Sequence, residues 1–288
     1  MSNEILDWSV IDYKSTVGHL LQQKGSKLRN SVMVESFQGK SGMALNQVGS
    51  VTAQKKTTRH ADTPLIETPQ DRRWIYPVDY EWADLIDDQD KLRIIADPTS
   101  PYAMNGAYAL GRAMDDEIIA AATGTAKTGE DGDTSTTFPA GQTAATTSGG
   151  LTIAKLREAM QLLIAAEVDV DNEELYCLIG AQQHDDLLGE TQAVSLDYTN
   201  VPVLVGGRIK SFMGFNFIDS QRLALSGTDR TVICYAKSGI ALGMWNDIEA
   251  RLSERDDKSY ATQVYVKGTF GATRLEEQKV VAITCSEA

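Results

Sequence analysis

Apolar and polar positions alternate along the segment from Trp74 to Trp82. Four aromatic residues and one valine occupy every second position there, which predicts an extended strand with these five side chains on one face. Pro77 lies inside the run and has no N–H to donate, so we expect the strand to lie at the edge of a sheet. Such an aromatic face needs a partner surface. If that surface belongs to another subunit, Trp74→Ala or Trp82→Ala is expected to impair the assembly of subunits more than their folding.

A helical pattern follows between Ser100 and Gly124. Ser100 suits an N-cap, Pro101 suits the first helical position, and Gly124 suits the end of the helix. About 22 residues at 1.5 Å each give roughly 33 Å, which predicts a spine across the molecule. Asp115, Asp116 and Glu117 are expected on its solvent or interface face. One apolar face is formed by Met104, Tyr108, Gly111, Met114, Ile118 and Ala121 or Ala122.

Helical and strand patterns mix along the rest of the chain, which predicts the α+β class. Thr152 can cap a second helix with an apolar stripe, and a hairpin is expected to bend at Gly214. Strand patterns dominate from residue 231 onwards. Residues 1–47 show no sustained period and predict an extended arm, whereas the Gly-, Thr- and Ser-rich residues 125–150 predict a loop.

The composition narrows the function classes. The 288 residues carry a net charge of -13, which argues against a dedicated nucleic-acid binder. Cys177, Cys234 and Cys285 are odd in number and far apart, so we expect neither a disulfide framework nor a CxxC metal pair, but a reducing compartment. No apolar window approaches about 20 residues and no signal pattern is present, which predicts a protein made in the cytosol without a membrane contact.

Candidate catalytic patterns are weak. The segment 124–128 (GTAKT) ends like a phosphate loop, but Ala126 replaces the glycine before the lysine and a helix precedes it. His184 with Asp185 and Asp186 favours a solvated helix surface over a metal site, since adjacent residues do not share a helix face. We therefore predict a non-enzymatic protein with no catalytic, cofactor-binding or metal-binding residues.

A basic arm at residues 53–73 precedes an acidic block at residues 79–90. The arm could contact nucleic acid, but its acidic residues leave a net charge of about +2 and its aromatics lie at one end. It could be a linker, although a linker would lack the aromatic run. It could also lie on the acidic region of a neighbouring copy, and head-to-tail contacts of that kind close into rings. The predicted inter-subunit contact residues are Lys55, Lys56, Arg59, Arg72, Arg73, Trp74, Tyr76, Tyr80, Trp82, Asp84, Asp87 and Asp88.

The block from Asp62 to Gly129, which begins DTPLIETPQDRRWIYPVDYEW and ends ATGTAKTG, resembles the major capsid proteins of tailed bacteriophages, which have the Hong Kong 97-like capsid fold. The order of segments supports the resemblance, which covers nearly the whole chain. A long extended hairpin and a spine helix precede an α+β region, and IEARLSERDDKSYATQVYVKGTFGATRLEEQKVVAIT then supplies two long strands and a return strand.

This resemblance implies a division of the chain, which consists of an N-terminal arm (1–47), an extended loop over a neighbouring subunit (48–80), a peripheral domain with the spine helix (81–124 and 247–271) and an axial domain (125–246 and 272–288). It also implies a structural role without chemistry. Copies form pentamers and hexamers that build an icosahedral head around double-stranded DNA, with no sequence-specific DNA contact.

The resemblance further implies partners and a location. The arm before Asn46 is shorter than an ordinary domain, so a separate scaffolding protein is expected. A portal protein and a decoration protein are further candidate partners, and no membrane partner is expected. The protein would be found in the virion after assembly in the host cytoplasm. The alternative is a nucleic-acid-binding oligomer that uses the basic arm at residues 53–73.

Overall fold

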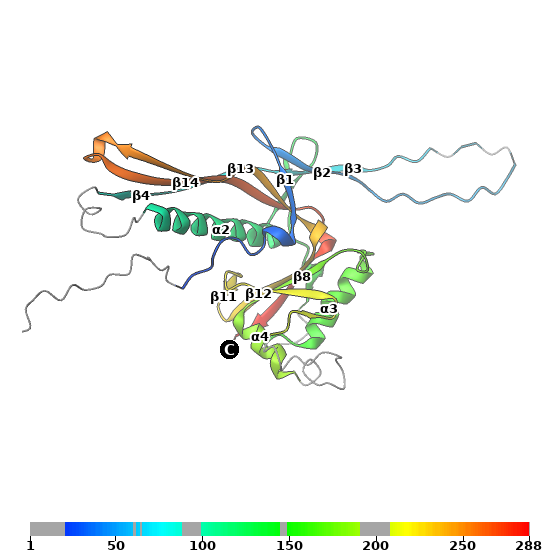
Figure 1. Cartoon of the computed structure of the whole chain (residues 1–288). Coiled ribbons are helices and arrows are strands. Elements are labelled where there is room, and N and C mark those ends of the chain that lie inside the picture. Colours follow the sequence, from blue (N-terminus) through cyan, green and yellow to red (C-terminus); the bar gives the residue numbers. More distant parts are fainter. Residues whose placement is uncertain are drawn as a thin grey trace, which may run out of the picture.

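The structure is a computed structural model. It describes residues 21–59, 62–63, 65–87, 99–144, 149–190 and 208–287. A long flat layer with a helix along it lies beside a second α+β layer, and a narrow loop projects from the end of the flat layer (Figure 1).

The flat layer is a four-stranded sheet with one long helix packed on it. Its strands follow the order β1 (Met33–Ser36), β13 (Ile240–Arg255), β14 (Ala261–Arg274) and β4 (Val78–Ile86). β1 runs parallel to β13, and the other pairs are antiparallel. α2 (Thr99–Thr123) lies along this sheet (Figure 1), where its Met114 and Ile118 share a buried cluster with Phe270. The apolar face of the helix and the buried face of β14 therefore make one core.

The second layer is a seven-stranded sheet with two helices. Cys177, Val232 and Ile283 are buried in the same cluster as Leu156 and Leu163 of α3 (Ile153–Ala165), so the core lies between the sheet and this helix. Thr152 caps α3 by accepting a hydrogen bond from the Lys155 N–H. The elements are β7 (Thr143–Ala144), β15 (Val280–Ser286), β12 (Asp229–Ala236), β8 (Leu175–Ile179), β10 (Phe215–Asp219) and β9 (Ser211–Phe212) in sheet order, β11 (Leu225–Ser226) on β12, α3 (Ile153–Ala165) and α4 (Ala181–Gly189).

A third, small sheet supports the projecting loop. Its order is β2 (Gly42–Val48), β3 (Gln70–Ile75), β5 (Ala126–Thr128) and β6 (Thr134–Thr136). The expected extended loop at 48–80 includes β3 and the start of β4, so the name is kept below for residues 49–69, which leave β2 and return into β3. The Gly49 N–H donates to the Pro69 carbonyl at 2.7 Å across the base of this loop. Short 3-10 turns occur at Arg29–Ser31 (η1), Ala140–Gln142 (η2), Lys237–Gly239 (η3), Asp256–Lys258 (η4) and Glu277–Lys279 (η5).

The expected helix end and the expected hairpin turn agree with the structure. α2 ends at Thr123, where the Gly124 N–H donates to the Ala120 carbonyl. It begins at Thr99, so the predictions that Ser100 is its N-cap and Pro101 its first residue are wrong. The hairpin between β9 and β10 bends at Met213 and Gly214, which both have positive φ, as a tight hairpin turn requires. β4 lies at the edge of its sheet, but Pro77 precedes it and β3 is an inner strand of another sheet, so the expected edge strand around Pro77 is not formed.

The prediction of a single strand from Trp74 to Trp82 is wrong. β3 ends at Ile75 and β4 starts at Val78, and the two strands belong to different sheets. The chain crosses closely over β14 at this break, since a Cβ added at Gly271 would lie 2.2 Å from the Tyr76 carbonyl oxygen. The proline therefore separates two strands instead of marking one irregular strand.

Two predictions of irregular structure are wrong in part. Within the predicted arm, residues 21–47 build η1, β1 and most of β2, and Leu28 and Val32 are buried in the core against α2. Residues 1–20 lie outside the described residues. Within the predicted loop 125–150, β5, β6, η2 and β7 form because short polar strands pair with better-defined neighbours. Propensity alone does not reveal strands that tertiary pairing creates.

Candidate subunit-interaction surface

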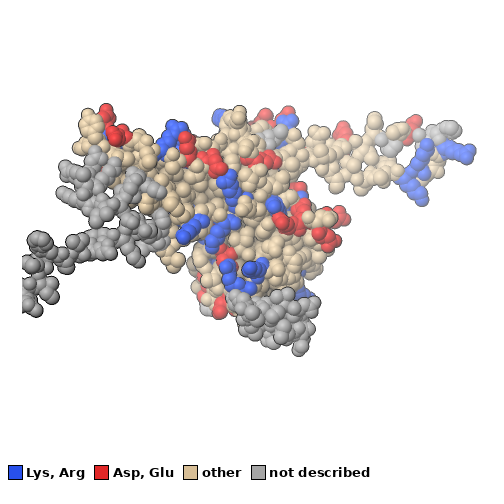
Figure 2. Space-filling model, viewed as in Figure 1, with Lys and Arg blue, Asp and Glu red and all other residues tan. Residues whose placement is uncertain are grey.

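The extended loop presents charged and apolar side chains away from the body. Lys55, Lys56 and Arg59 are exposed, and none of them makes a hydrogen bond or ion pair with another residue that the structure describes. Figure 2 shows lysine and arginine gathered at the far end of the loop. Leu65 is 99% exposed and Ile66 is 44% exposed, which leaves apolar area in water. No other described part of the chain packs on this surface.

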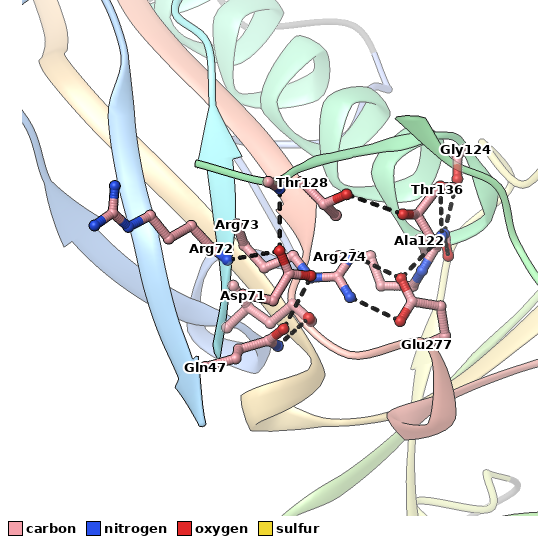
Figure 3. A network of polar contacts seen from close by, with 12 residues as sticks. Gln47, Asp71, Arg72, Arg73, Ala122, Gly124, Thr128, Thr136, Arg274 and Glu277 are labelled. Carbon is pink, nitrogen blue, oxygen red and sulfur yellow. Dashed lines mark hydrogen bonds and ion pairs between the residues drawn. The ribbon is translucent and has the colours of Figure 1, made fainter. Parts of the chain in front are cut away.

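A polar network holds the base of the loop (Figure 3). The Arg73 guanidinium donates to both carboxylate oxygens of Glu277, at 2.7 and 2.9 Å, and its Nε donates to Gln47 Oε1 at 3.2 Å. Asp71 Oδ1 accepts the N–H groups of Arg72 and Gly129. These contacts join β2, β3 and the turn at Gly129 to η5. They fix the direction in which the extended loop leaves the body.

A second buried arginine continues this network to the end of α2. Arg274 is fully buried and donates to the Ala122 and Gly124 carbonyls at 3.0 and 2.8 Å, where the partial negative charge of the helix terminus favours a cation. Its guanidinium also lies 5.2 Å from the centroid of the Phe138 ring. Burial lowers the pKa of Arg274, and the charge of Glu277 opposes that shift. Glu277 pairs with Arg274 at the end of α2 and with Arg73 at the loop base, and it therefore couples the two.

The predicted aromatic contact residues are divided between two sites within the subunit. Trp74 Nε1 donates to the Gly129 carbonyl at 2.8 Å. Tyr80 stacks on Phe270 with ring centroids 4.9 Å apart, and the ring of Trp82 packs against α2 at Gly106. The prediction that these aromatics form one face without an internal core is therefore wrong.

Tyr80 also makes a short polar contact on α2. Its hydroxyl donates to Glu117 Oε1 at 2.5 Å. Burial, followed by the hydrogen bond and charge of Glu117, raises the pKa of Tyr80 to about 12. Tyr76 differs from the other aromatics of the run, because it is 43% exposed.

The predicted charged contacts also have different environments. Arg73 is buried in its intramolecular ion pair, so its position gives no support for a contact with another subunit. Arg72 is half-buried, with its side chain 3.5 Å from the Glu130 carbonyl. Asp84 is half-buried, Asp87 is exposed, and Asp88 lies outside the described residues. The contact roles of the exposed residues stay predictions.

Asp115 does not lie on the solvent or interface face of α2, where it was expected. It is fully buried. Its carboxylate accepts hydrogen bonds from Gln23 Nε2, Ser26 Oγ and the backbone N–H groups of Lys27 and Leu28. The signal was available, because Asp115 follows Gly111 by four residues and precedes Ile118 by three, which places it on the predicted apolar stripe. A carboxylate at such a position needs internal donors.

The weak catalytic candidates have structural roles. His184 Nε2 accepts the Ile209 N–H at 3.3 Å and Asp186 accepts the Leu151 N–H at 2.9 Å. These two side chains are half-buried, and Asp185 is exposed, as expected on a solvated helix surface. The segment 124–128 contains β5 and is not a phosphate loop. Across the described ranges, no group of three or more His, Cys, Asp and Glu side chains could hold a metal ion. No helix in the same ranges is both long and apolar enough to span a membrane.

The projecting loop, the long helix on a strand pair and the separate α+β layer define the class of the protein: it has the Hong Kong 97-like fold of phage major capsid proteins. The sequence pattern of the family described as phage capsid protein matches residues 5–287. The chain therefore belongs to the phage capsid protein family, whose members are structural proteins of the virion.

Solved structures agree with this family. The capsid structure of the cyanophage P-SCSP1u is similar at a TM-score of 0.73 and 14% identity, over 96% of this chain and 94% of that chain. The mature capsid of bacteriophage PhiM1 gives 0.73 at 12% identity, over 98% and 93%. The capsid of cyanophage Pam1 gives 0.73 at 12% identity, over 100% and 99%. No curated protein sequence matches the chain.

Proposed function

We propose that this chain is a major capsid protein whose copies assemble, through their extended loops, into the pentamers and hexamers of an icosahedral phage head around double-stranded DNA. The carrying observation is the extended loop itself. It leaves the body at a rigidly held base and then presents Lys55, Lys56, Arg59 and Leu65 to solvent. A folded body that holds such a loop in one direction is suited to contact another copy.

The proposal includes the expected division into arm, loop, peripheral and axial domains. The sheet with β13 and β14 carries the peripheral contacts, and the seven-stranded sheet lies at the capsomer axis. A separate scaffolding protein, a portal protein and a decoration protein are the proposed partners, and assembly takes place in the host cytoplasm. The role requires no catalysis and no sequence-specific contact with DNA.

The rival function, nucleic-acid binding through residues 53–73, loses support from the geometry. Arg73 is buried against Glu277, so at most four of the five cations of the arm can meet phosphate. Phosphate contacts are what give nucleic-acid affinity its steep salt dependence. Because the whole chain has a net charge of -13, the remaining cations are a weak basis for this function.

Electron microscopy of the purified protein tests the proposal. We expect capsomers or shells, formed by the chain alone or after addition of the scaffolding protein from the same phage. A variant in which residues 50–68 are replaced by a short Gly-Ser linker should keep its circular dichroism and unfolding transition but remain monomeric. A wild-type protein that stays monomeric under all these conditions and binds DNA with steep salt dependence would favour the rival function.

A further inference from the structure

Two of the three cysteines face each other inside the seven-stranded sheet. Cys177 of β8 and Cys234 of β12 are directly opposite in antiparallel register, and the Cys234 thiol donates to Cys177 Sγ at 3.2 Å. Both side chains are fully buried. Cys285 lies on β15, where its register partner is Arg230. The sheet therefore contains one matched pair of thiols and one separate thiol.

The backbone geometry of this pair suits a covalent bond. Opposite residues of an antiparallel pair have Cα atoms about 4.5–5.5 Å apart, which overlaps the range of about 4.4–6.8 Å found for disulfides. The two sulfur atoms are 3.2 Å apart and need to approach by roughly 1 Å to reach bonding distance. Small rotations of the two side chains supply that movement, so the strands need not separate.

We propose that Cys177 and Cys234 form an internal disulfide when the folded protein meets a peroxide. One sulfur attacks a peroxide oxygen, the O–O bond breaks, and a sulfenic acid and one water form. The second sulfur then displaces hydroxide from the sulfenic sulfur, the S–S bond forms, and the hydroxide takes the remaining thiol proton as a second water. Two thiols lose two electrons and the peroxide gains two.

Burial of the pair slows its oxidation, and the disulfide that forms stabilises the folded protein. Burial, with the hydrogen bond from Cys234, raises the pKa of the Cys177 thiol well above its ordinary value, so little thiolate is present at neutral pH and oxidation is slow. The bond would link β8 to β12 across 57 residues of chain, which restricts the unfolded state and stabilises the folded one. This inference does not depend on the proposed function.

Thiol mapping of the full-length protein tests it. The protein is reduced with dithiothreitol, desalted, incubated with hydrogen peroxide at neutral pH, treated with catalase, and then denatured in iodoacetamide. We expect alkylated cysteines to fall from three to one per chain, with Cys285 the alkylated residue. Peptide mapping without reductant should find Cys177 joined to Cys234. The thermal unfolding midpoint should rise on oxidation and return to its first value when the protein is unfolded, reduced and refolded.

Two variants show which cysteines react. Cys285→Ala should keep the disulfide and the rise in midpoint, whereas Cys234→Ala should lose both. Three alkylated cysteines after peroxide, sulfinic acid without a disulfide, or a disulfide that contains Cys285 would each overturn the proposal. If Cys234→Ala does not fold, the comparison of reduced with oxidised wild-type protein still decides the question.

Discussion

Arg73 and Glu277 form a two-pronged ion pair, with donor to acceptor distances of 2.7 and 2.9 Å. The side chains are only 6% and 18% exposed, so the pair lies mostly out of water. It connects β3, the strand that follows the extended loop, to η5, the turn before the last strand. The loop base is therefore fixed to the body by side chains as well as by strand pairing.

Removal of this glutamate charge should destabilise the subunit. Glu277→Gln leaves Arg73 and Arg274 buried without a counter-charge, and we expect a loss of roughly 3–5 kcal/mol in the free energy of unfolding, measured by urea denaturation. The adjacent Glu276 is the matched control, because its side chain is 42% exposed and pairs with Lys279 at 3.4 Å. Glu276→Gln should cost less than about 1 kcal/mol. Equal losses in the two variants would contradict the importance of the buried pair.

Replacement of Asp115 and replacement of its neighbour Asp116 should cost very different amounts of stability. Asp115→Ala leaves the buried backbone N–H of Leu28 without its acceptor and removes the acceptor of the partly buried Lys27 N–H, and an unsatisfied buried group costs about 1–3 kcal/mol. Asp116→Ala removes only an exposed ion pair with Arg222, worth less than about 1 kcal/mol. Urea denaturation of both variants measures the difference. If Asp116→Ala loses more stability than Asp115→Ala, residues 23–28 are not held on α2 in the way described.

Tyr80 should give the subunit a stability loss at high pH. Its pKa is raised from 10.0 to about 12 in the folded protein, so between these values the folded state keeps a proton that the unfolded state loses. The contribution is complete below pH 10 and disappears as the pH rises to 12. Tyr80→Phe should be less stable at neutral pH and should lose less stability across this interval. Denaturation at a series of pH values measures both, and identical slopes for the two proteins would refute the assignment.

Gly111 should be irreplaceable although it lies inside a helix. Alanine there would gain up to about 1 kcal/mol from helix propensity. Its Cβ, however, would lie 2.6 Å from the Gly25 carbonyl carbon, so the segment that Asp115 holds would have to move. We expect Gly111→Ala to lose about 1–3 kcal/mol net. A variant that is more stable than the wild type would show that the close approach is unimportant.

Charge reversal at the loop tip should separate assembly from folding. Changing Lys55, Lys56 and Arg59 to Glu should leave the unfolding transition within about 0.5 kcal/mol of wild type, since these exposed side chains have no described partner. Assembly, followed by light scattering and electron microscopy, should be strongly reduced. The control reverses three exposed lysines of the body, Lys24, Lys40 and Lys210. Equal effects of the two triple variants would point to net charge and not to the loop.

Local patterns predicted the elements whose signals lie close together in sequence. The stop at Gly124, the cap at Thr152 and the turn at Gly214 each depend on residues within a few positions, and the structure agrees with all three. The alternation of buried positions in β14 was equally readable, because a period of two is a local property.

Features that depend on distant segments were missed. Asp115 is satisfied by residues about 90 positions earlier, and Trp74 to Trp82 was read as one strand because the crossing over Gly271 lies far along the chain. The pairing of Arg73 with Glu277 was missed for the same reason, because the two residues lie far apart in the sequence. Glu277 also pairs with Arg274. A charged residue on an apolar stripe indicates that a partner exists, but single-sequence periodicity does not name that partner.

The described residues of the extended loop are tied to the body at its base, where the Gly49 N–H meets the Pro69 carbonyl. The entropy of closing such a loop grows slowly, by about 0.6 kcal/mol for each doubling of its length. Insertions or deletions near its tip would therefore change the reach of the loop with little effect on the stability of the body. The length of the loop can thus vary independently of the folded body that holds it.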